Sequence, residues 1–136
     1  MNKNQVFNGK IDEFGFPFLI VDILNPKTEE VILNAKAIID TGAAYSHIKK
    51  EVIRNLKLTS SKEVIVKHAV DGEVESGIFN INIIFNKKIN VPNIDARLLH
   101  TDYPSDLIIG LDIIKYCNFQ YNSKNKTFSF QLFPNP

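Results

Sequence analysis

Apolar residues recur at every second position in two segments of this chain, and this pattern narrows the range of possible folds more than any other. From Val31 to Ile39 every second residue is apolar, and the segment from Phe79 to Phe85 alternates in the same way. A period of two turns one face of an extended strand toward a core and the other toward solvent. The chain is therefore expected to consist mainly of half-buried β-strands.

Turn signals divide the chain into further elements. We expect strands over residues 16–24, 31–39, 64–70, 79–85, 107–109 and 127–133. The first two should form a hairpin through Asn25-Pro26-Lys27, which is typical turn chemistry. Apolar residues at helical spacing predict a short helix over 49–56, and Asp112 is expected to cap a second one that runs through Cys117. Short strands at regular spacing indicate a closed or sandwich-like all-β domain.

Length and composition indicate the number of domains and the kinds of partner to be expected. The chain has 136 residues and no linker or low-complexity segment, so residues 1–136 are expected to form one domain. The net charge of +1 gives no reason to propose nucleic acid or an anionic membrane surface as a partner. No apolar stretch approaches the roughly 20 residues that span a bilayer, and the amino terminus lacks an apolar signal core. We expect a soluble, cytoplasmic protein.

The sequence does not indicate a metal site or a nucleophilic serine. The histidines, His47, His68 and His100, are dispersed and lack the spacing of a zinc motif. Neither a Gly-x-Ser-x-Gly elbow nor a glycine-rich phosphate loop is present. Cys117 is the single cysteine and is expected to be a core residue. We therefore expect the protein to need neither a metal nor a cofactor.

Two apolar runs end at glycine-bearing loops. Ile38-Ile39-Asp40-Thr41-Gly42-Ala43 follows the alternating strand, and Leu107-Ile108-Ile109-Gly110 stands about 70 residues later. The two runs show a weak internal sequence similarity, since only the first carries a carboxylate in its loop. With the predicted hairpin at Asp71-Gly72 between them, they resemble the retropepsin-like aspartic proteases over roughly residues 31–119. The resemblance implies a retropepsin-like closed β-barrel with a flap hairpin and one or two short helices.

The resemblance also implies hydrolysis of peptide bonds by a water molecule that two aspartates activate. Two carboxyl groups that share one proton supply both a base for the water and an acid for the substrate, because like charges this close do not readily ionise together. This chain supplies one such loop, so the implied enzyme is a C2 homodimer with Asp40 from each subunit. Thr41 would hydrogen-bond across the dimer, or else satisfy its own turn. Gly42 would allow close approach of the substrate, or else tolerate a positive φ.

Six further positions are implied to bind the peptide or protein substrate. They are Ala43, Ala44, Val70, Asp71, Gly72 and Ile109. Asp71-Gly72 would form the tip of a flap that closes over the substrate, and the alternative is an ordinary surface hairpin. Tyr45 is expected to be a packing residue, with a place in a substrate pocket as the alternative.

The chain departs from the retroviral pattern at two positions. Retroviral enzymes often pair an Asp and an Arg where this chain has Ala44 and Leu111. Their joint absence predicts replacement by apolar packing, because a single buried charge is costly. Two alternatives stay open: a non-catalytic peptide-binding or assembly module with the same fold, and a structural barrel in which Asp-Thr-Gly is only a turn.

Two further features bear on pH and on dimerisation. Pepsin-like relatives commonly carry a hydroxyl residue where this chain has Ala43, and a hydroxyl donor stabilises an ionised carboxylate. Without that donor, we expect activity closer to weakly acidic or neutral pH than to the strongly acidic range. In the final strand Phe128, Phe130 and Leu132 alternate with polar residues. This strand would either interleave between subunits, as in retroviral enzymes, or close its own barrel.

Overall fold

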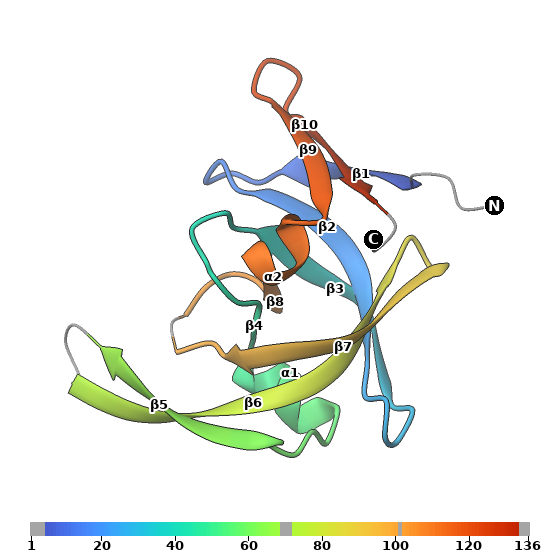
Figure 1. Ribbon diagram of the computed structural model, residues 1–136. Helices are drawn as coiled ribbons and strands as arrows, with labels where there is room; N and C mark the ends of the chain where they lie inside the picture. Colours follow the sequence, from blue (N-terminus) through green and yellow to red (C-terminus); the bar gives the residue numbers. More distant parts are fainter. Residues whose placement is uncertain (1–4, 69–71, 101, 134–136) are drawn as a thin grey trace.

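A computed structural model shows a β-barrel with a smaller sheet attached to it (Figure 1). The structure describes residues 5–68, 72–100 and 102–133. Its elements are β1 Gln5–Ile11, β2 Pro17–Leu24, β3 Val31–Ile39, β4 His47–Ile48, α1 Lys50–Asn55, β5 Lys62–His68, β6 Gly72–Phe85, β7 Ile89–Leu98, β8 Leu107–Ile109, α2 Leu111–Ile114, β9 Cys117–Asn122 and β10 Thr127–Leu132.

The barrel closes because β6 pairs with strands on both of its sides. Strands follow the order β6-β7-β4-β8-β3-β2, and β2 then pairs with the far end of β6. Beyond β2, the order continues through β1 and β10 to β9. The expected closed, all-β barrel with short helices is thereby confirmed.

Alternating side chains fill the barrel, but only after a break in β3. Ala35, Ala37 and Ile39 are at most 4% exposed, whereas Leu33 is 61% exposed. Asn34 has a positive φ of 59°, and the β2–β3 register shifts at this level. A bulge of this kind turns the preceding side chains to the opposite face. The prediction that the whole run from residue 31 faces one side is therefore wrong at its beginning.

The bulge is held by a buried carboxylate. Asp22 is 4% exposed and accepts hydrogen bonds from the Asn34 amide at 2.9 Å and from Lys87 Nζ at 2.8 Å. Burial raises the pKa of Asp22, but the Lys87 ammonium and the Asn34 amide outweigh it, so the pKa lies below its ordinary value. The contact ties the β2–β3 hairpin to the turn between β6 and β7.

Most predicted strands are present, and the structure adds four strands that the sequence analysis does not predict. Residues 17–24, 31–39, 107–109 and 127–132 are strands as expected, while the predicted 64–70 strand runs from 62 to 68. The strand expected over 79–85 begins at Gly72. Strands β1, β4, β7 and β9 were not expected. In β7, Pro92 and the positive φ of Asn93 interrupt the alternation that would have revealed the strand.

The region after β8 also differs from the prediction. The helix α2 ends at Ile114, and Cys117 begins β9 instead of lying on that helix. Cys117 is half-buried, its Sγ donates to the Ile113 carbonyl at 3.2 Å, and burial raises the pKa of its thiol to about 12. Cys117 is therefore a protonated packing residue at neutral pH.

Neither of the described helices is long and apolar enough to cross a membrane.

Candidate active site

The two similar apolar runs of the sequence form adjacent strands in the structure. β3 and β8 run parallel, with Ile38 opposite Ile108 and Ile39 opposite Ile109. Because parallel neighbours end on the same edge, both glycine-bearing loops leave the barrel side by side. The Asp40 amide donates to the Ile109 carbonyl at 2.9 Å, which joins the two loops at their first residue.

The loop after β3 presents Asp40 toward solvent. Asp40 Oδ1 accepts a hydrogen bond from the Gly42 amide at 2.8 Å, and its carbonyl accepts one from the Ala43 amide at 3.2 Å. Asp40 and Ala43 are partly exposed, whereas Thr41, Gly42 and Ala44 are exposed. The carboxylate is thus oriented by its own turn and remains accessible to a reactant. Gly42 does not have a positive φ, so that explanation for the glycine does not apply.

The loop after β8 is buried and depends on its glycine. A Cβ on Gly110 would lie 2.5 Å from the Tyr45 carbonyl oxygen and 2.7 Å from the Ala43 carbonyl oxygen. The Leu111 amide donates to the same Ala43 oxygen at 2.8 Å. Gly110 therefore allows α2 to begin directly against the backbone of the Asp40 loop.

A buried serine and an aspartate fasten the Asp40 loop to α2. Asp112 Oδ2 accepts from the Ser46 amide at 3.0 Å, and Oδ1 accepts from the Ser46 hydroxyl at 2.8 Å. The Gly110 amide donates to Ser46 Oγ at 3.2 Å, and Ser46 is 0% exposed. The prediction that Asp112 caps the helix is wrong, because Gly110 occupies the N-cap position and Asp112 lies in the first turn. Sequence reasoning missed Ser46, for which the sequence holds no motif.

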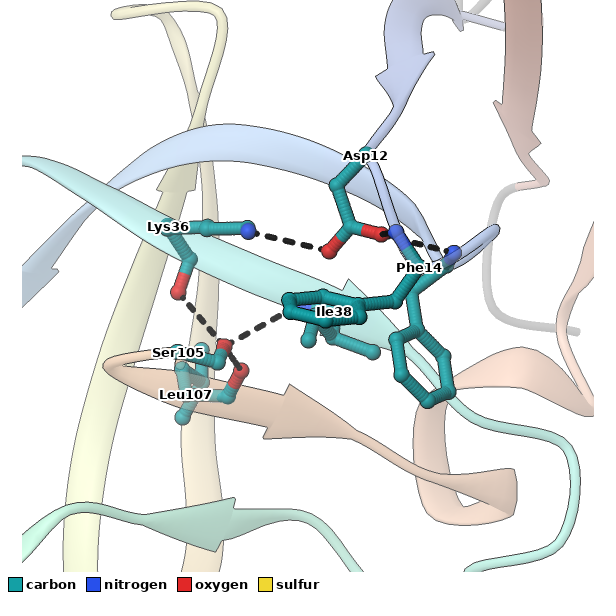
Figure 2. Close-up of polar contacts among 7 residues, drawn as sticks. Asp12, Phe14, Lys36, Ile38, Ser105 and Leu107 are labelled. Atoms are coloured by element: carbon teal, nitrogen blue, oxygen red, sulfur yellow. Dashed lines mark hydrogen bonds and ion pairs between the residues drawn. The ribbon is translucent and has the colours of Figure 1, made fainter. Parts of the chain in front are cut away.

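A serine hydroxyl joins the last part of β3 to the start of β8 (Figure 2). Ser105 Oγ accepts from the Ile38 amide at 3.4 Å and lies 3.0 Å from the Lys36 carbonyl oxygen and 2.6 Å from that of Leu107. The Lys36 amide donates to Asp106 Oδ2 at 2.9 Å. These contacts hold the two strands in register two to four residues before Asp40.

Asp12 extends this arrangement to the β1–β2 turn (Figure 2). Its carboxylate accepts from the Phe14 and Phe16 amides, each at 2.9 Å, and from Lys36 Nζ at 3.0 Å. Burial raises the pKa of Asp12, but these three donors and the Lys36 charge outweigh it, so the pKa is lowered. The turn is therefore bound to β3 by a mostly buried ion pair, since the Asp12 side chain is 8% exposed.

The remaining predicted substrate positions lie in different surroundings. Ile109 is 0% exposed in the barrel core, so its link to the Asp40 loop is its backbone carbonyl. Val70 and Asp71 lie outside the described residues. Gly72 pairs with His68 as the first residue of β6, so it lies in a strand and not at the hairpin tip expected at Asp71-Gly72. The β5–β6 hairpin itself is present and extends away from the barrel (Figure 1).

The positions that depart from the retroviral pattern both lie at the surface. Ala44 is exposed and Leu111 is 42% exposed, so neither is buried in apolar packing within the subunit, contrary to the expectation. The ring of the neighbouring Tyr45 is 47% exposed and lies against the Arg97 guanidinium at 3.7 Å. In the described part of the chain, no three His, Cys, Asp or Glu side chains gather closely enough to hold a metal ion.

Comparisons with known proteins agree with this geometry. Residues 32–116 match the family described as "gag-polyprotein putative aspartyl protease". Fourteen chains of solved structures match, among them a retropepsin-like aspartic protease from Rickettsia conorii. That match has a TM-score of 0.64 and 14% sequence identity, and it covers 96% of this chain and 91% of the other. No curated protein sequence matches significantly. Because the family match includes the Asp40 loop, Gly110 and α2, the chain belongs to the retropepsin-like family of gag-type aspartyl proteases.

Proposed function

We propose that the protein is a homodimeric aspartic endopeptidase whose catalytic dyad consists of Asp40 from each of two subunits. The observation that carries the proposal is the partly exposed Asp40 carboxylate, held by the Gly42 amide at the end of β3. The family match over residues 32–116 supports the same chemistry. A single chain offers one such loop, so a second copy is required.

In the proposed reaction the dyad carries one proton. The ionised carboxylate takes a proton from the water as its oxygen attacks the peptide carbonyl, and the protonated partner gives its proton to the carbonyl oxygen. Collapse of the tetrahedral intermediate returns a proton to the leaving nitrogen and breaks the C–N bond. Gly42 orients Asp40 for this exchange through its amide, and Ser46, Asp112 and Gly110 keep the loop in place.

The edge strand β9 supports pairing with a second copy. β10 already pairs with β1 on one side and β9 on the other, so it is not free to interleave. β9 ends the strand order, and its sequence, Cys-Asn-Phe-Gln-Tyr-Asn, contains neither charge nor proline. Natural edge strands normally carry such features to prevent association. In the proposed dimer, β9 pairs antiparallel with its symmetry mate and continues the sheet.

The catalytic part of the proposal is tested with Asp40→Asn. The variant should lose peptide cleavage by several orders of magnitude while its circular dichroism and melting temperature stay close to those of the wild type. Asp102→Asn changes an exposed aspartate outside the site and serves as the matched control. Activity that survives in the Asp40 variant would refute the proposal. Binding of peptides without cleavage by the wild type would favour the non-catalytic alternative.

The dimer is tested by charges placed on β9. Gln120→Lys and Gln120→Glu each bring like charges together across the symmetric pair and should each produce monomers in analytical ultracentrifugation. Mixing the two variants should restore dimers and cleavage, because opposite charges then face each other. Ser123→Lys, in the turn after β9, is the control and should remain dimeric. Dimers that persist in both Gln120 variants would exclude β9 as the interface.

A further inference from the structure

A row of residues crosses the barrel on the face opposite its core. The register pairs Ile38 with Ile108, Ile108 with His47, His47 with Arg97, and Arg97 with Ile78. Residues directly opposite each other on adjacent strands project to the same face of a sheet. The flanking positions Ala37, Ile39, Leu107, Ile109, Ile48 and Ala96 all belong to the core. The row itself therefore projects from the other face of the barrel wall, beside the point where β3 ends at Asp40. Ile38 and Ile108 are buried there, at 1% and 3% exposed, whereas His47, Arg97 and Ile78 are partly exposed.

This row lies between the proposed dyad and the β5–β6 hairpin. Its first member, Ile38, is two residues from Asp40, and its last, Ile78, is opposite Lys62 at the base of the hairpin. Strands are spaced about 4.8 Å apart, so β7 lies about 14 Å from β3 across three spacings. That distance corresponds to roughly four residues of an extended peptide. A substrate bound at Asp40 could therefore reach Arg97.

Arg97 places a positive charge in this row. Its guanidinium lies 3.7 Å from the centroid of the Tyr45 ring, which is half exposed. Among the side chains that the structure describes, which do not include those of residues 62–76, no carboxylate forms an ion pair with Arg97. Its amide donates to the Ser46 carbonyl at 2.9 Å, which fixes its backbone against the Asp40 loop. An arginine stacked on an aromatic ring retains edge N–H groups that can bind a carboxylate in a bidentate fashion.

The neighbouring histidine does not offer a second positive charge for a substrate carboxylate at neutral pH. His47 is the register partner of Arg97. Burial, with a further contribution from the Arg97 charge, lowers the pKa of His47 below its ordinary value. Its imidazole is therefore neutral at neutral pH, and Arg97 supplies the fixed positive charge of the row.

We propose that Arg97, held on the Tyr45 ring, is a specificity-determining residue that selects substrates with an acidic side chain within about four residues of the cleaved bond. This inference rests on the proposed peptidase function. It concerns the chemistry of the substrate and not the chemistry at Asp40. A substrate carboxylate would give Arg97 an ionic partner in addition to its contact with the Tyr45 ring.

The test compares three peptides that differ only in having Glu, Gln or Lys at one position near the cleaved bond. The wild type should cleave the Glu peptide with a kcat/KM about tenfold above that of the Gln peptide, which is the effect of one charge-assisted hydrogen bond. Arg97→Glu should reverse the order and favour Lys. Arg97→Gln should remove the preference without placing a new charge, which guards against misfolding of the reversed variant.

A control and a binding measurement separate this inference from the proposed function. Lys115→Glu removes another exposed cation that lies over an aromatic ring, Tyr116 at 5.1 Å, and should leave the preference unchanged. Asp40→Asn should bind the three peptides in the same order without cleaving them, as measured by fluorescence anisotropy. Cleavage with a preference that Arg97→Glu does not change would overturn this inference alone. A wild type that neither binds nor cleaves peptides would overturn both.

Discussion

The loops that follow β3 and β8 leave the same edge of the barrel from strands whose last three residues are similar, yet they differ in exposure. The first places Asp40 in a turn where the next two residues are exposed. The second places Gly110 in a buried position where a side chain would meet two backbone carbonyls. One loop thus presents a reactive group, and the other supports it from behind. Half of this site is therefore a support without catalytic chemistry of its own.

The largest difference between the two loops is expected in how much an alanine in place of Gly110 or Gly42 destabilises the protein. In Gly110→Ala the new Cβ collides with the Ala43 and Tyr45 backbone, so we expect the free energy of unfolding to fall by about 3 kcal/mol. In Gly42→Ala the nearest atom is Asp40 Oδ1 at 3.1 Å, which can move, so the loss should stay below about 1 kcal/mol. Urea denaturation measures both. Equal losses would show that the two loops do not divide their roles as described.

The second largest effect is expected for Asp112→Ala, which breaks the contact between the Asp40 loop and α2. The change leaves the buried Ser46 amide and hydroxyl without their carboxylate partner, so we expect a loss of about 2 kcal/mol. Activity should fall as well, because the Asp40 loop loses its attachment to α2. Asp102→Ala, at an exposed position, provides the comparison. Thermal melting that is unchanged in Asp112→Ala would rule out a supporting role for this carboxylate.

A smaller effect is expected where Ser105 joins the last part of β3 to the start of β8. Ser105→Ala removes a hydroxyl that contacts the backbone of both strands, and we expect a loss of about 1 kcal/mol. Hydrogen exchange at the Ile38 amide should become faster than in the wild type. Protection that stays the same would mean that strand pairing alone maintains the register before Asp40.

The smallest effect concerns the acid stability of the turn that Asp12 binds to β3. The pKa of Asp12 is lower in the folded protein than in the unfolded chain. The contribution of Asp12 to stability is therefore present above the unfolded pKa and is lost as pH falls through the folded pKa. The decrease should therefore begin below about pH 4. Asp12→Asn should reduce the slope of stability against pH in that range. A slope equal to that of the wild type would assign acid sensitivity to other carboxylates, among them Asp22.

Local patterns predicted the strands and the Asp40 loop because their signals lie within a few consecutive residues. Alternation identified β3, and the similarity of residues 37–40 and 107–110 indicated two related loops. The pattern could not reveal that Leu33 turns outward, because the bulge at Asn34 depends on a contact with Asp22 and Lys87. It could not assign Asp112 either, since a helix cap and a partner for Ser46 require the same carboxylate.

Local sequence patterns were enough to establish the strand-rich architecture, the position of Asp40 in a turn after an apolar strand, and the family. The residues that support that turn, the place of Arg97 and the position of β9 at the edge of the sheet became known from the folded chain. These two groups of features differ in the range of the interactions behind them. Alternation and turn chemistry act between near neighbours, whereas the Ser46–Asp112 contact joins residues 66 positions apart and forms only when β3, β4 and β8 pair.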